Sequence, residues 1–164
     1  MSWLISCQKG TVLSQADYNS RANKLIQQVI IDESCSCILE IPGESMINLN
    51  IAENPHQDIR KTILNKLQVR DRQELDSLEN LSKNFSLDTT FLTMQNVKII
   101  KRQSLRASNK DEYLFTKCPN GVLSILKPIF NKNYNSAVIN INYTFSDIQS
   151  PIKSYKFESN KWKK

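Results

Sequence analysis

The sequence predicts an α+β fold in which N-terminal amphipathic helices pack on a C-terminal antiparallel β-meander. Residues 136–146 alternate between apolar and polar side chains with one exception, Val138, which is typical of a strand with one face on a core and the other in water. Upstream, three segments place apolar residues three and four positions apart behind a capping residue, as amphipathic helices do. A chain of 164 residues suits one domain, and we expect a single α+β domain from 14 to 164.

Three helices are expected before the sheet. Ser14 is a typical N-cap, so the first helix should run from Gln15 to about Ile30. Asn54-Pro55 is expected to open the second helix, and Asp71 to cap the third. One further helical turn is an alternative for 86–93, and a short helix for 109–117. The apolar stripes of the three main helices are Ala22, Leu25, Ile26, Val29 and Ile30; Ile59, Ile63, Leu64 and Leu67; and Leu75, Leu78, Leu81 and Phe85.

Short strands are expected at 37–41 and 97–100, and the meander should begin at Val122. Pro128 marks an edge or a bulge in its first strand, because proline cannot donate to a β-ladder. The hairpin turns are predicted at 131–135 and 147–151, the returning strand at 152–157 and a last turn at Ser159-Asn160.

The net charge of +6 is unevenly distributed along the chain. Residues 32–58 hold six acidic side chains and no lysine or arginine, whereas 97–133 hold eight basic side chains against Asp111 and Glu112. We expect these segments to complement one another within the fold. The basic residues are spread through predicted strands and loops instead of clustering on one face, so nucleic acid is not an expected partner. No apolar run approaches the roughly 20 residues needed to cross a bilayer.

Leu4-Ile5-Ser6-Cys7 resembles the lipobox of bacterial lipoproteins, in which a small residue precedes a cysteine that is diacylated. A complete signal also needs a basic region and an apolar region of about 7–15 residues, and only Met1-Ser2-Trp3 precede the motif. We therefore expect the native gene to begin upstream and the mature protein to start at a lipidated Cys7, with 1–13 as residual signal and tether. If Met1 is the true start, Cys7 is an ordinary thiol and the protein is cytoplasmic.

The C-terminal third carries a family resemblance. Residues 121–132, Ala137-Val138-Ile139 and Asn160-Lys161-Trp162-Lys163 are similar to the C-terminal half of a group of small exported bacterial proteins with no assigned activity, many of which carry a lipoprotein signal. The resemblance implies a cell-envelope location, lipid-anchored or periplasmic, and the membrane as a partner through Cys7. It identifies no protein partner, which stays unknown, and supplies no catalytic residue. Many of those proteins have a Cys-Gly-rich segment after the Ala-Val strand, which 143–151 lack, so no site is transferred there.

The remaining cysteines allow at most one disulfide. With Cys7 acylated, three are left, an odd number. In an exported protein either Cys35 or Cys37 can pair with Cys118, and the sequence does not separate these two alternatives from a third, in which no disulfide forms.

No catalytic, cofactor-binding or metal-ligating residue is predicted. His56 is the only histidine, and its spacing from Glu53 and Asp58 matches no metal motif. The sequence favours a non-catalytic exported lipoprotein or periplasmic module with a binding or structural role. The alternative is a small ligand-binding or enzymatic domain of the cone-shaped nuclear-transport-factor-like type, whose terminal Lys-Trp-Lys strand is similar. A filled core of Ile139, Ile141, Tyr143 and Phe145 would favour the module, and a polar pocket between helices and sheet the alternative.

Overall fold

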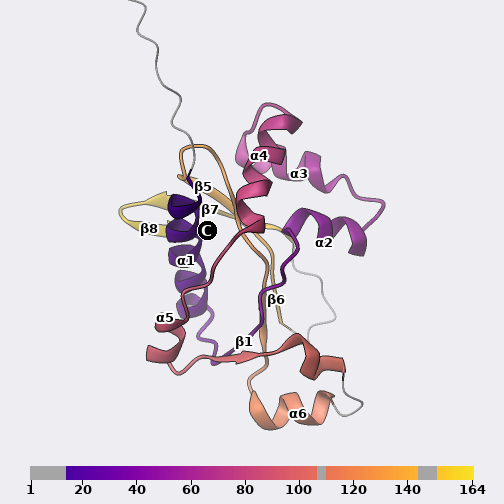
Figure 1. Cartoon of the computed structure of the whole chain (residues 1–164), viewed down its shortest axis with the longest axis vertical. Helices are drawn as coiled ribbons and strands as arrows, with labels where there is room; N and C mark the ends of the chain where they lie inside the picture. Colours follow the sequence, from indigo (N-terminus) through magenta and orange to yellow (C-terminus); the bar gives the residue numbers. More distant parts are fainter. Residues whose placement is uncertain (1–13, 107–109, 144–150) are drawn as a thin grey trace, which may run out of the picture.

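The computed structural model describes residues 14–106, 110–143 and 151–164 and confirms the α+β class (Figure 1). The strands form two four-stranded sheets. The mixed sheet has the order β2-β1-β3-β6, and the antiparallel sheet has the order β4-β5-β7-β8. The strands are β1 Cys37–Leu39, β2 Lys98–Ile100, β3 Leu123–Ile125, β4 Ile129–Phe130, β5 Ser136–Ile139, β6 Ile141–Tyr143, β7 Lys153–Glu158 and β8 Lys161–Lys163.

One long bent hairpin joins the two sheets. Its first arm is β3 followed by β4, and its second arm is β5 followed by β6, so each sheet receives one half of each arm. The expectation of one continuous strand over 136–146 is therefore wrong, because pairing is interrupted at Asn140. Pro128 lies at the matching point of the first arm, where it cannot donate to a ladder. The Leu126 N–H donates to the Asn140 carbonyl at 3.0 Å and holds the two arms together at the bend.

The mixed sheet contains both parallel and antiparallel strand pairs. β1 pairs in parallel with both β2 and β3, whereas β3 pairs antiparallel with β6. In the antiparallel sheet, β7 runs along β5 from Ser136↔Lys156 to Ile139↔Lys153 and then turns into β8. The last turn contains Ser159 and Asn160, both with positive φ, and a pair of left-handed residues suits a tight hairpin. Of the second predicted turn, 147–150 lie outside the described residues.

The helices are α1 Gln15–Asp32, α2 Met46–Glu53, α3 Ile59–Leu67, α4 Arg72–Lys83, α5 Thr89–Met94 and α6 Lys110–Lys117, with a 3-10 turn at Arg102–Arg106. Two predicted caps are confirmed, since the side chains of Ser14 and Asp71 accept from backbone N–H groups in the first turns of α1 and α4. The predicted start of the second helix is wrong. Asn54 ends α2, a helix not expected from the sequence, and Asp58 caps α3.

Helices cover both faces of the antiparallel sheet (Figure 1). α1 packs on one face, against buried side chains that include Phe130, Ile139 and Trp162, and we call this group the first cluster. On the other face, Val138 is fully buried among side chains of α2, α3 and α4. The expectation that this second face meets water is therefore wrong. The polar residue Asn140 follows the same pattern, with only 5% of its surface exposed.

A third cluster lies against the mixed sheet. It is formed by Cys37, Leu39, Ile100, Leu114, Cys118 and Val122. Leu114 belongs to α6, and Leu39 and Ile100 come from the paired strands β1 and β2. α6 is thus held to the sheet by a small number of buried side chains.

Replacing Ile141 by alanine should lower the free energy of unfolding by about 2–5 kcal/mol, because its side chain is 1% exposed in the first cluster and truncation leaves a cavity. Urea melts will measure the loss. Ser154→Ala, at an exposed position of β7, should change the stability by less than about 0.5 kcal/mol. Asn142, expected to face water, is half-buried and donates to Asn140, so it is not a neutral control. Equal losses for Ile141→Ala and Ser154→Ala would contradict the placement of Ile141.

Candidate functional site

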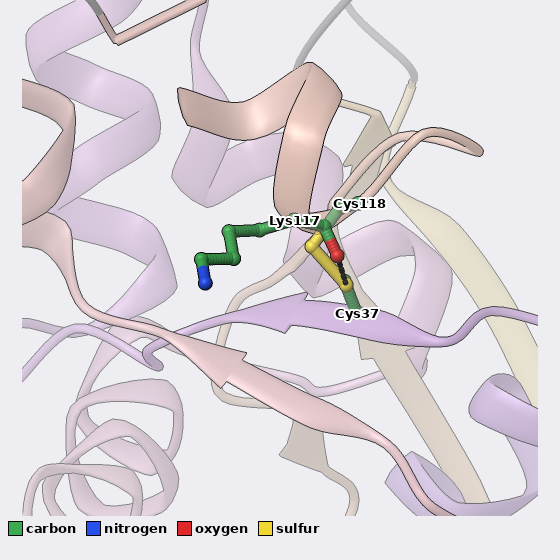
Figure 2. The surroundings of a disulfide bond; sticks show 3 residues. All are labelled: Cys37, Lys117 and Cys118. Carbon is green, nitrogen blue, oxygen red and sulfur yellow. Dashed lines mark hydrogen bonds between the residues drawn. A yellow bond between two sulfur atoms is a disulfide. The ribbon is translucent and has the colours of Figure 1, made fainter. Parts of the chain in front are cut away.

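A disulfide joins β1 to the end of α6. Cys37 and Cys118 are bonded, with their Cα atoms 6.0 Å apart and a sequence separation of 81 (Figure 2). This is one of the two pairings that the sequence left open. The Cys37 sulfur also lies 3.8 Å from the Lys117 carbonyl oxygen. Because a sulfur in a disulfide carries no proton, that approach is a packing contact and not a hydrogen bond.

Cys35 is a free thiol, and it belongs to a different part of the core from Cys37. Its half-buried side chain packs against the first cluster, whereas Cys37 lies in the third. Burial, reinforced by the negative charge of Glu33, raises the pKa of Cys35 to about 11. A thiol with so high a pKa is a poor nucleophile near neutral pH. Cys7 lies outside the described residues.

Glu33, just after α1, connects that helix to the C-terminal strands. Its carboxylate accepts a hydrogen bond from Lys164 at 3.0 Å and lies 3.6 Å from Lys153. The Tyr143 hydroxyl lies 3.4 Å from the same carboxylate. Burial raises the pKa of Glu33, but the hydrogen bond from Lys164 and the two lysine charges outweigh it, so this pKa lies below its ordinary value of 4.5.

At neutral pH the wild type should have a larger free energy of unfolding than Glu33→Gln, and this difference, the stability gap, should shrink as the pH falls below 4.5. A carboxyl with a depressed folded-state pKa stabilises the fold above its unfolded-state pKa, and this contribution is lost as it is protonated. Urea unfolding of both proteins over that range will measure the gap. Glu158→Gln is the control, because Glu158 and Lys163 are both more than half exposed and such pairs contribute little. A gap that widened in acid would contradict this assignment.

The expected complementarity of the acidic and basic segments is visible in the described ion pairs. Glu40 lies 2.8 Å from Lys101, and its backbone carbonyl accepts from Arg102 at 2.8 Å. These contacts tie the segment after β1 to the segment after β2. They place part of the acidic segment against the basic one. Glu33, also in the acidic segment, is paired instead with Lys153 and Lys164 of the C-terminal strands.

The buried charged side chains of the described residues are Glu79 and Lys127, and both have protein partners. Glu79 of α4 accepts from the Ser45 hydroxyl and from the Arg60 guanidinium at 3.2 Å. Lys127, at the hairpin bend, donates to the carbonyls of Gly43 and Lys83 at 2.6 and 3.0 Å. Burial lowers the pKa of Lys127. Glu79 is paired with the Arg60 cation, and Lys127 is held by two backbone carbonyls. Because both side chains are engaged within the fold, they are poor candidates for ligand binding.

Carboxamides converge at a cavity between α2, α3 and the hairpin bend. We call this cavity of about 260 Å³ the amide cleft. It is lined by Asn50, Glu53, Asn54, Gln57, Ile59, Thr62, Lys66, Asn140, Asn142, Pro151 and Ile152. Its position between helices and sheet is the one at which a polar pocket would favour a ligand-binding role.

The amide cleft has a hydrogen-bonded floor. Asn140 donates to the Asn50 side-chain oxygen at 3.2 Å, and Asn142 donates to the Asn140 side-chain oxygen at 3.1 Å. Asn50 in turn donates to the Met46 carbonyl at 2.8 Å. Asn50 and Asn140 are only 4% and 5% exposed. Buried amides need hydrogen-bond partners, so this row of three side chains holds a fixed orientation.

A second, larger cleft is open and charged. Its volume is about 740 Å³, and it lies between the α3–α4 connection and the turn from β4 to β5. Its cations are Arg70, Lys132 and Lys156, all exposed, and Lys132 lies 3.3 Å from Glu74. Solvated charges of this kind are common on protein surfaces. The amide cleft is the better candidate site because two of its polar side chains, Asn50 and Asn140, are buried.

His56 lies exposed in the turn between α2 and α3. Its neighbours in sequence have structural positions, since Glu53 ends α2 and Asp58 caps α3. Within the described ranges, no group of three or more His, Cys, Asp or Glu side chains is placed to hold a metal ion. None of the described helices is both long and apolar enough to span a bilayer.

No protein-family profile, curated protein or solved structure matches this chain.

Proposed function

We propose that this protein is a non-catalytic binding module that works outside the cytoplasm and is anchored to the membrane by lipid on Cys7. The observation that supports it is the Cys37–Cys118 disulfide. Disulfides form and persist in oxidising compartments, such as the periplasm and the cell surface, and are rare in reducing cytosol. The lipobox-like motif that ends at Cys7 supports the anchor, since two or more acyl chains give stable membrane attachment.

The core and the amide cleft support a module with a binding role. Ile139 and Ile141 are buried and Tyr143 is half-buried on the α1 side of the sheets, so that side is filled, while Phe145 lies outside the described residues. On the other side, the floor of the amide cleft consists of carboxamides. Carboxamides donate and accept hydrogen bonds but do not titrate, so they suit recognition of a ligand better than proton transfer.

The test is to express the gene with its natural upstream sequence and to fractionate the cells. The protein should be recovered with the membranes, and Cys7→Ser should release it into a soluble fraction. In the same cells, Cys37 and Cys118 should be protected from a thiol-alkylating reagent until a reductant is added. Cys35→Ser is a matched control that should leave both results unchanged. A soluble protein that keeps Met1 and has reduced Cys37 and Cys118 would overturn the proposal.

A further inference from the structure

We propose that the amide cleft binds one neutral sugar residue. This inference rests on the binding role proposed above and names the ligand class of the same site. The juxtaposition that carries it is a hydrogen-bonded row of three asparagine side chains, Asn50 and Asn140 buried and Asn142 half-buried, facing a cavity of about 260 Å³. Two further carboxamides, Asn54 and Gln57, lie at its edge.

The buried amides have unused hydrogen-bonding capacity. A carboxamide offers two N–H groups and two acceptor sites on its oxygen. In the hydrogen bonds of the described residues, Asn140 donates once and accepts once through its side chain, and so does Asn50. Each therefore keeps a second N–H, and an N–H shielded from bulk water is costly to leave without a partner. A ligand in the cleft, or ordered water in its absence, can supply that partner.

The chemistry of the lining matches vicinal hydroxyl groups. A hydroxyl both donates and accepts, and a carboxamide presents both functions side by side, so one amide can engage two neighbouring hydroxyls of a sugar ring. Ile59, Pro151 and Ile152 provide an apolar wall, against which the C–H face of the ring can lie. Glu53 and Lys66 carry opposite charges in the lining, so their formal charges cancel and a neutral ligand is favoured.

The size of the cleft also limits the ligand. Its volume of about 260 Å³ lies just below the roughly 300–1,000 Å³ of pockets that take drug-sized ligands. That space admits one sugar ring and no polymer along its length, so the expected ligand is a monosaccharide or the terminal residue of a glycan. No aromatic side chain is among the lining residues that the structure describes, and stacking on a ring is therefore not part of the expected binding. A weak affinity, with a Kd of about 1 mM, is expected from hydrogen bonds and this small apolar contact.

Nuclear magnetic resonance on the full chain can test this directly. Glucose, galactose and N-acetylglucosamine are titrated into isotopically labelled protein, with glucuronate and glycylglycine as the charged and peptide comparisons. A neutral sugar should shift the side-chain amide signals of Asn50, Asn140 and Asn142 in a saturable manner. Glucuronate and glycylglycine should bind at least tenfold more weakly.

Two variants and a matched control locate the site. Gln57→Ala removes an exposed amide of the rim, and Asn142→Asp keeps the shape of the side chain but removes its donors. Each should weaken sugar binding by about tenfold, the loss expected for one or two hydrogen bonds. Asn133→Ala removes an exposed amide of the open charged cleft and should change nothing. If Gln57→Ala melts at the same temperature as the wild type, its weaker sugar binding is not caused by a loss of folding.

The inference is overturned if no neutral sugar shifts the three asparagine signals at saturating concentration. It is also overturned if glycylglycine or glucuronate binds more tightly, or if the sugar shifts fall at Asn133 instead of the amide cleft. These results are independent of cell fractionation. A membrane-associated protein that binds no sugar refutes only the ligand class, whereas a cytoplasmic protein that binds sugar refutes only the export and the anchor.

Discussion

Replacing Cys37 and Cys118 together by alanine should lower the free energy of unfolding by about 4.5 kcal/mol. The bond joins two residues with a sequence separation of 81. In the chain-entropy description, a cross-link over that length lowers the conformational entropy of the unfolded chain by about this much free energy. The midpoint of thermal unfolding should fall by roughly 9–18 °C for a chain of this size. Thermal and urea melts of the wild type and the double variant will measure both effects.

Cys35→Ala is the control that distinguishes the effect of losing the disulfide bond from the effect of losing a cysteine side chain in the core. Cys35 is half-buried and unbonded, so its replacement should cost far less than loss of the disulfide. Adding a reductant to the wild type should reproduce the double variant, and adding it to the double variant should have no effect. If the double variant melted at the same temperature as the wild type, the bond would contribute nothing to stability, and the entropic account would be wrong.

Phe130→Ala should destabilise the protein by about 3–5 kcal/mol, the usual cost of truncating a buried aromatic side chain. Phe130 is 1% exposed and lies at the centre of an aromatic group. Its ring centroid lies 5.6 Å from that of Tyr18 and 5.5 Å from those of both Tyr134 and Trp162. These rings come from α1, the β4–β5 turn and β8, so the truncation removes contacts between distant parts of the chain.

Phe130→Leu is the matched control for this position. Leucine keeps most of the apolar volume and loses the ring geometry, whose pairwise contribution is about 0.5–1.5 kcal/mol. The leucine variant should therefore retain clearly more stability than the alanine variant in urea melts. Equal losses would show that the ring contacts, and not the filled volume, account for the whole effect, contrary to this expectation.

Helix starts were predictable where one side chain caps the backbone. Ser14 and Asp71 act within three residues of sequence, so local sequence contains the whole signal. α2 escaped prediction because Asn50 occupies one of its buried positions, and a polar residue there interrupts the apolar stripe that marks a helix. Without α2, Asn54 looked like the start of the next helix.

The break between β5 and β6 could not be predicted from alternation. Ile139 and Ile141 both pack in the first cluster, so the apolar positions keep their period of two across Asn140. Alternation reports which face a side chain occupies. It does not report which strand lies alongside, and in this hairpin the partner changes from β4 and β7 to β3.

The amide cleft could not be predicted from alternation either. Asn140 and Asn142 occupy the polar positions of the alternating segment, and such positions indicate solvent when no helix is known to cover them. The spacing of Asn50 and Asn54, four residues apart, places two amides on one side of a helix and is the signal that could have pointed to the cleft. The pairing of Cys118 with Cys37 was equally open, because two candidate thiols lie two residues apart.

The bent hairpin has a consequence for how the protein opens. Because β3 with β4 and β5 with β6 each contribute to both sheets, neither sheet can separate without straightening or breaking an arm that the other one needs. Regions that open independently require a boundary crossed by few contacts, and the Leu126–Asn140 hydrogen bond lies at the place where such a boundary would have to form. The slowest-exchanging amides of the two sheets are therefore expected to exchange in a single event, at the free energy of global unfolding.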